Sequence, residues 1–158
     1  MAVGCACASA QVGTAATGSD ADVVTGLSPV VALPLNTTNN DIDAGYYELG
    51  SIGNYVWADT NGDGLQTGGE PGIPNVVVTL TGTDGAGNPV SNTTTTNGSG
   101  QYLFPNLAPG TYKLTFGTPT GYTVTGIDKG GNDATDSDAN TASGMMTITE
   151  VLTAGETN

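Results

Sequence analysis

The sequence predicts an all-β protein, and three of its features support this prediction. The 158 residues include 25 glycines and 8 prolines, and only 11% of them are charged. This composition disfavours long helices and suits short strands joined by turns. Short segments of apolar and β-branched residues alternate with turn residues, and the chain length suits one domain plus an extension. We therefore expect one β-sandwich of about seven strands with an extended N-terminal segment.

The predicted strands follow one another after residue 50. The segment "SIGNYVWAD" (51–59) alternates large apolar residues with smaller ones, and "NVVVTLTG" (75–82) is a β-branched run. In "APGTYKLTF" (108–116) the apolar residues recur at every second position, which is the period of a half-buried strand. The complete set of predicted sandwich strands is 51–59, 75–82, 90–97, 101–107, 108–116, 121–128 and 144–153.

Six aromatic side chains are expected to fill the core of this sandwich. Large aromatic rings bury more apolar surface than other side chains, so a small sandwich depends on them. The expected core aromatics are Trp57, Tyr102, Phe104, Tyr112, Phe116 and Tyr122.

The first 36 residues contain two further predicted strands, 22–27 and 29–35, which we expect to seek a sheet edge and to pack on a neighbouring molecule. Cys5 and Cys7 are too closely spaced to bridge each other comfortably. Two states remain open for them, free or processed thiols and an intermolecular disulfide.

The charge balance excludes several classes of function. The chain has 15 acidic residues, two lysines, no histidine and a formal charge of −13. Such a surface repels nucleic acids and anionic membranes, and no apolar run approaches the roughly 20 residues of a membrane span. Without histidine, the commonest general base is missing, and we expect no enzyme. A glycosidase-like carboxylate pair is the enzymatic alternative, but the carboxylates concentrate in loops.

One acidic loop, "DTNGDGLQTGGE" (59–70), matches the calcium-binding pattern D-x-[DN]-x-[DN]-G-x5-E. In this pattern alternate side-chain oxygens, one carbonyl and a final bidentate carboxylate surround Ca²⁺, and Gly64 makes the bend. Pro71 stops any helix after the loop, so we expect a calcium loop between strands. A solvated acidic turn is the alternative. The expected ligands are Asp59, Asn61, Asp63, Leu65 and Glu70.

Several motifs together resemble a known family. "GSIGNYVWADTNGDGLQTGGEPGIPNVVVTLTG", "GSGQYLFPNLAPGTYKLTF", "GYTVT", "GGNDATDSDAN" and "LTAGETN" are similar to the SdrD B-like domain of bacterial surface proteins, a relative of the collagen-adhesin B-type domain. The resemblance covers residues 50–158. It implies an extracellular Ig-like or prealbumin-like sandwich, rigidified by calcium at the 59–70 loop, that normally occurs in tandem as a stalk or spacer.

A second acidic cluster lies in "DKGGNDATDSDAN" (128–140), where unneutralised carboxylates would repel one another. The resemblance makes a second calcium site the expectation, although a solvated acidic turn remains the alternative. The expected ligands are Asp128, Asp133, Asp136 and Asp138. Some relatives carry a Lys–Asn isopeptide bond, but the first strand here has no lysine, so we expect none.

One strand of the family pattern stands in an unusual place. Family domains usually continue beyond "LTAGETN" into a strand resembling "xxIDAGxY", whereas here "NNDIDAGYY" occupies residues 39–47, upstream of the sandwich. Three explanations are open: the segment completes a neighbouring molecule head to tail, it remains from a preceding repeat, or it inserts into its own domain. The expected assembly residues are Asp41, Ile42, Asp43, Ala44, Gly45, Tyr46 and Tyr47.

These observations predict three regions and a structural role. Residues 1–36 form an extended segment, 37–49 a candidate donor strand and 50–158 the calcium-binding sandwich. We expect a subunit of an extracellular bacterial fibre or surface assembly whose main partner is another copy of itself, with other cell-surface proteins as further candidates. The alternative is a spacer or stalk module of a bacterial adhesin.

Overall fold

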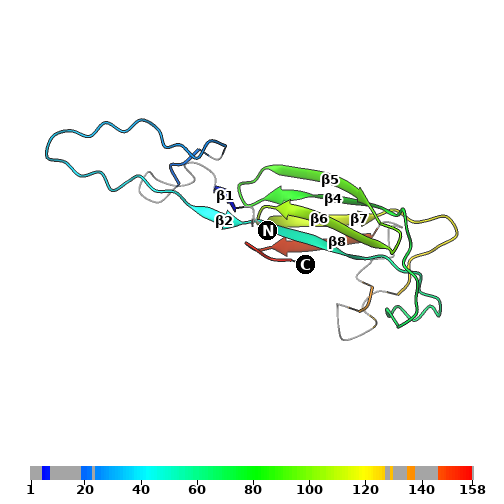
Figure 1. Cartoon of the computed structure of the whole chain (residues 1–158). Coiled ribbons are helices and arrows are strands. Elements are labelled where there is room, and N and C mark those ends of the chain that lie inside the picture. The colour runs from blue at the N-terminus through cyan, green and yellow to red at the C-terminus, as the bar shows by residue number, and fades with distance from the viewer. Residues whose placement is uncertain are drawn as a thin grey trace. The chain divides into compact units, whose positions relative to one another are not determined.

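The computed structural model describes residues 5–7, 19–22, 24–126, 129, 135–137 and 146–157. The chain forms two compact units, Met1–Leu49 and Gly50–Asn158. Every regular element in the described residues is a β-strand (Figure 1). No helix among these residues has the length and apolar character needed to cross a membrane.

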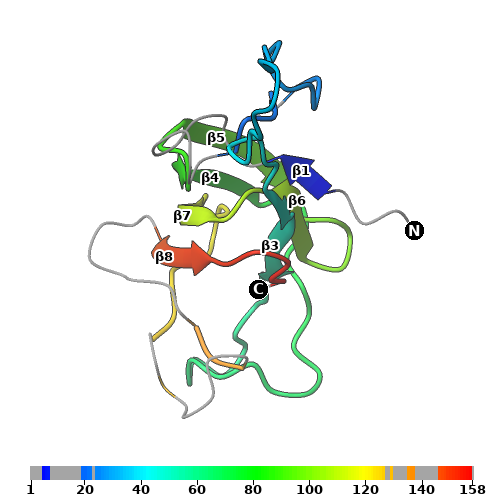
Figure 2. The ribbon, with the colours of Figure 1, turned by 90° about the vertical axis from the view of Figure 1, so that its left-hand side faces the viewer.

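The unit Gly50–Asn158 is a sandwich of two unequal antiparallel sheets. One sheet has four strands in the order β5-β4-β7-β8, and the other pairs only β3 with β6. Figure 2 shows the four strands on one side and β3 and β6 on the other. The strand bounds are β3 Gly50–Tyr55, β4 Val77–Asp84, β5 Pro89–Thr95, β6 Gln101–Leu107, β7 Gly110–Phe116 and β8 Met146–Leu152.

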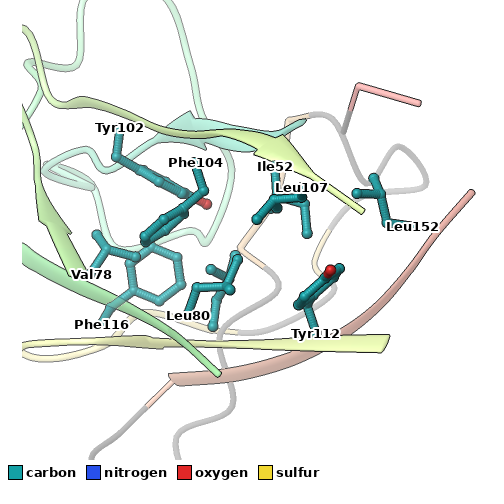
Figure 3. Packing of buried hydrophobic residues seen from close by; sticks show 10 residues of the cluster. Ile52, Val78, Leu80, Tyr102, Phe104, Leu107, Tyr112, Phe116 and Leu152 are labelled. Atoms are coloured by element: carbon teal, nitrogen blue, oxygen red, sulfur yellow. The ribbon is translucent and has the colours of Figure 1, made fainter. Parts of the chain in front are cut away.

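The core fills the space between the two sheets, with side chains from alternate strand positions (Figure 3). Val78 and Leu80 of β4 are fully buried. The ring of Tyr102 meets Phe104 and Phe116 edge to face, with centroid separations of 6.2 and 5.4 Å. These geometries are the ones that aromatic quadrupoles favour. The predicted all-β sandwich is confirmed.

Two of the expected core aromatics lie elsewhere. Tyr102, Phe104, Tyr112 and Phe116 are buried as predicted. Trp57 is only half-buried, and Tyr122 is 49% exposed. The strand predicted at 121–128 is wrong over its described residues, 121–126, which form none. The amide of Tyr122 donates instead to the carbonyl of Pro119 at 3.1 Å, so this aromatic belongs to a turn.

The unit Met1–Leu49 contains one short ladder, in which β1 (Cys5–Cys7) pairs antiparallel with β2 (Tyr46–Glu48). The strands predicted at 22–27 and 29–35 are wrong, because their described residues form none. The carboxylate of Asp22 instead accepts the amides of Val24 and Thr25 at 3.0 and 2.7 Å and closes a turn. The large apolar side chains described in these segments are exposed, from 40% for Val31 to full exposure for Val30.

A buried threonine joins the start of β4 to the segment after the acidic loop. The side chain of Thr96 is 2% exposed, and its hydroxyl donates to the carbonyl of Ile73 at 2.7 Å. The same hydroxyl accepts the amide of Val76 at 2.9 Å. One hydroxyl therefore satisfies two backbone groups that would otherwise be buried without partners.

We predict that Thr96→Val lowers the free energy of unfolding by about 1–3 kcal/mol, because it keeps the shape but leaves two polar groups unsatisfied. Its neighbour Thr95 is exposed. Thr95→Val is thus the matched control and should change stability by less than about 0.5 kcal/mol. Urea denaturation of both variants measures the difference, and equal stabilities would contradict the role of Thr96.

Candidate metal centre

The acidic loop 59–70 begins and ends on a short antiparallel pairing. The amide of Ala58 donates to the carbonyl of Pro71 at 2.9 Å, and Trp57 bridges Gly72. The hydroxyl of Tyr55 at the end of β3 donates to the carbonyl of Glu70 at 3.4 Å. These contacts hold the two ends of the loop together at the end of the sandwich, so the loop needs no flanking helices.

The first three predicted side-chain ligands are oriented by the loop's own backbone. Asp59 accepts the amides of Gly62 and Gly64 at 2.6 and 2.8 Å. The side-chain oxygen of Asn61 accepts the amide of Asp63 at 3.1 Å. Asp63 in turn accepts the amide of Leu65 at 2.8 Å. Each carboxylate has about four lone-pair sites, so these bonds fix its direction and leave acceptor capacity for a cation.

Glu70, the last predicted ligand, reaches back across the loop. One carboxylate oxygen accepts the amide of Thr60 at 2.9 Å, and the other accepts the amide of Thr67 at 2.9 Å. Glu70 therefore joins loop positions 2, 9 and 12 through two hydrogen bonds. The side chain already points toward the loop that it would close around a metal ion.

Gly64 is required at the bend for two reasons. Its φ is +82°, a conformation that residues with a side chain rarely adopt. A Cβ at this position would also lie 2.6 Å from Cγ of Lys129 and 2.7 Å from the carbonyl oxygen of Gly126. The stem of Lys129 therefore packs directly against the loop at Gly64.

A distant threonine also holds the first ligand. The hydroxyl of Thr125 donates a short hydrogen bond to Asp59. This bond, more than those from the amides of Gly64 and Gly62, holds the pKa of Asp59 below its ordinary value of 3.8. Thr125 was not among the predicted site residues, because it lies 66 residues from Asp59 and no local pattern marks it. It reaches the loop because 117–126 and 59–70 lie at the same end of the sandwich (Figure 1).

The second acidic cluster is only partly described. Asp128, Asp133 and Asp138 lie outside the described residues. Asp136 is 6% exposed and bridges Leu65, the residue expected to offer its carbonyl to calcium. The amide of Gln66 donates to the carbonyl of Thr135 at 2.7 Å. The structure thus joins the described part of the second cluster to the middle of the first loop.

The donor set of the loop fits a hard cation. All four side-chain ligands, Asp59, Asn61, Asp63 and Glu70, offer oxygen, and Ca²⁺ prefers carboxylate and carbonyl oxygens. No three acidic or thiol side chains in the described part of the chain yet gather closely enough to hold a metal ion. The carboxylates instead bind backbone amides, so calcium would have to draw Asp59, Asp63 and Glu70 inward.

A cavity of about 540 Å³ adjoins the loop, and both apolar side chains and polar ones such as Asp59 and Asp136 line it. Its walls come from the end of β3, from Phe116 at the end of β7 and from the turn that contains Tyr122. Trp57 also lines it, and its indole Nε1 is buried without a hydrogen-bond partner among the described residues. Buried indole N–H groups normally have an acceptor, and the described residues supply none here.

The predicted assembly residues divide between two environments in the unit Met1–Leu49. Residues 41–45 form no strand, although the carbonyl of Asp43 accepts the amide of Asp20 at 2.9 Å. Tyr46 and Tyr47 belong to β2 and pair with Cys7 and Ala6. The side chains of Ile42 and Tyr46 are 43% and 62% exposed. The segment therefore presents apolar surface to solvent.

Comparison with known proteins identifies the family of the sandwich. Residues 50–158 match the family described as SdrD B-like domain. Serine-aspartate repeat-containing protein F of Staphylococcus epidermidis (strain ATCC 12228) is 43% identical over 116 residues, which are 73% of this chain and 7% of that protein. Serine-aspartate repeat-containing protein D of Staphylococcus aureus (strain Newman) is 42% identical over 110 residues, 68% of this chain and 8% of that protein.

The matched region is thus one small part of each relative, and the chain spans less than a tenth of their length. The family match covers more than half of this chain, including both acidic loops and all six strands of the sandwich. The protein belongs to the SdrD B-like domain family.

Proposed function

We propose that this protein is a structural, non-catalytic subunit of an extracellular bacterial fibre or surface assembly. Calcium stabilises its sandwich at the 59–70 loop, and the segment 41–47 of one copy completes the sandwich of the next. The observation that carries the proposal is the mismatch between the sheets, since a two-stranded sheet faces a four-stranded one. A sheet this narrow leaves strand edges that invite pairing with another chain.

Calcium has a defined place in this proposal. The chain carries a formal charge of −13, and four oxygen-bearing side chains of one loop are oriented by backbone amides. A divalent cation would offset the mutual repulsion of these carboxylates. Because the loop ends pair with each other and with β3, its ordering would stabilise the adjoining end of the sandwich.

A second candidate function is a spacer module of a longer surface protein, in which residues 39–47 belong to a preceding repeat. One finding favours the spacer role. The region that matches this chain makes up only 7% and 8% of the two relatives, so in them it is one part of a much longer protein. This role needs calcium for rigidity but no self-assembly. The two functions therefore differ in the behaviour of the purified chain.

Calcium should raise the stability of the chain, and the effect should depend on Glu70. With free calcium at 100 times its Kd, ligand linkage adds about 2.7 kcal/mol to the free energy of unfolding. We predict that Glu70→Gln loses most of this increment, because an amide is a poor bidentate ligand. Glu48 is exposed and outside the loop. Thermal unfolding with calcium and with chelator should show the full increment in Glu48→Gln, and an unchanged increment in Glu70→Gln would refute the site.

Thr125 should act on calcium affinity through Asp59. Removing the hydroxyl with Thr125→Val leaves Asp59 less firmly oriented, and loss of such supporting hydrogen bonds typically lowers metal affinity about 10–100-fold. Thr125→Ser keeps the hydroxyl and should stay close to the wild type. Calorimetric titration with CaCl₂ measures both. If the valine and serine variants bind calcium equally well, Thr125 has no role in the site.

Self-assembly is tested by microscopy and sedimentation of the full chain with calcium and with chelator. We predict calcium-dependent filaments that disappear in Ala44→Pro, because proline removes a main-chain donor from the added strand. Ala44 is exposed and outside any ladder, so Ala44→Ser is the matched control and should retain filaments. A chain that stays monomeric under every condition would contradict self-assembly and favour the spacer function.

A further inference from the structure

The free edge of β3 already holds the beginning of an added strand. The amide of Ser51 donates to the carbonyl of Glu156 at 2.9 Å, and Ser51 forms a parallel bridge with Thr157. The hydroxyls of Ser51 and Thr157 also lie 3.3 Å apart. This is the only bridge on that edge within residues 50–55 of the described chain. Chain segments can therefore pair along this edge of β3.

The rest of this edge has backbone groups that can form hydrogen bonds with an added strand. The amide of Val56 donates to Gly100 on the opposite side, toward β6. The backbone N–H and C=O groups of successive residues point to opposite edges of a strand. The groups of Gly53 and Tyr55 therefore point to the same edge as those of Ser51. Tyr55 at the end of this strand and the nearby Trp57 line the cavity that adjoins the acidic loop.

Building on the proposed function, we propose that the acceptor is this edge of β3 and that residues 41–47 of a second copy add to it as a parallel strand. The donor enters beside Ser51, where it takes the place of Glu156 and Thr157, and leaves beside Tyr55. Its alternation suits the site, because Ile42, Ala44 and Tyr46 share one face, and Tyr46 comes beside Asn54 and Tyr55, which line the cavity. Asp41 and Asp43 then face solvent.

The bridge already present on this edge favours the parallel direction, because Ser51 and Thr157 pair in parallel. A parallel donor follows the direction of this bridge and leaves at the opposite end, where Tyr55 and Trp57 line the cavity.

The chain length shows why the donor must come from another copy. Along β3, the distance from Gly50 to Tyr55 is about 17 Å at about 3.3 Å per residue. A parallel donor ending beside Tyr55 in the same chain would have to return to Gly50 through Glu48 and Leu49 alone. That connection spans at most about 11 Å, and parallel neighbours need a crossover of about a dozen residues. Self-insertion in this direction is therefore excluded.

Parallel addition also determines what lies at each joint. The donor segment ends beside the acceptor's Tyr55, whose hydroxyl binds the last residue of the acidic loop. Two residues later the donor's own sandwich begins. The acceptor's 59–70 loop therefore lies at the junction between copies. The donor's β2 keeps β1 on its other edge, so the joint forms a four-stranded sheet, β1-β2 of one copy and β3-β6 of the next.

Cross-linking of full-length chains tests the site and the direction. Every chain carries Cys5→Ser and Cys7→Ser, and filaments are verified by microscopy before a short bis-maleimide is added. One chain carries Asn54→Cys on β3, and it is mixed with a chain carrying either Glu48→Cys or Asp41→Cys. All three positions are exposed. The two donor positions are matched acidic residues at opposite ends of the donor segment.

The expected result is a cross-linked dimer with Glu48→Cys and roughly tenfold less with Asp41→Cys, because these positions are about 23 Å apart in a strand. The reverse preference would overturn the parallel direction. Filaments without cross-links from Asn54→Cys to either position would overturn β3 as the acceptor while leaving the proposed assembly intact. If no filaments form, the proposed function fails, and this inference fails with it.

Discussion

The packing of two unequal sheets is the constraint on which the rest of this structure depends. The core is built from alternate residues of β3, β4, β6, β7 and β8, and it needs both sheets to exclude water. Because one sheet has only two strands, part of the core lies near an open edge rather than beneath a neighbouring strand. Within the described residues the outer edge of β3 carries one bridge, at Ser51, and Tyr55 at the end of this strand lines the cavity beside Trp57.

The acidic loop is linked to this edge by direct contacts. Tyr55 ends β3 and also binds the backbone of Glu70, while Thr125 and Asp136 connect the loop to two later segments of the chain. A cation that orders the loop would therefore also stabilise the end of β3. The chain has only two lysines to balance its carboxylates, which makes an external cation the natural source of compensating charge.

The sequence was sufficient for features that depend on local pattern. The strands of the sandwich and the loop glycine at residue 64 follow from alternation and from conformational preference. It was insufficient where tertiary contacts decide. Nothing near Thr125 indicates that its hydroxyl reaches Asp59, and four consecutive threonines before Asn97 do not reveal which one is buried. The apolar runs before residue 36 resembled strands, but Asp22 closes a turn, and the described residues of 22–35 form no strand.

The short connection between the donor segment and β3 reconciles the two candidate functions. In a tandem protein, a strand that completes one repeat would be followed at once by the first strand of the next. This chain has the same order, with residues 41–47, then Glu48 and Leu49, then β3. Such a connection is too short for parallel self-insertion but sufficient to join two successive sandwiches. Whether the preceding sandwich is covalently attached or is a separate copy, the same edge of β3 would receive the strand, and the same loop would lie at the joint.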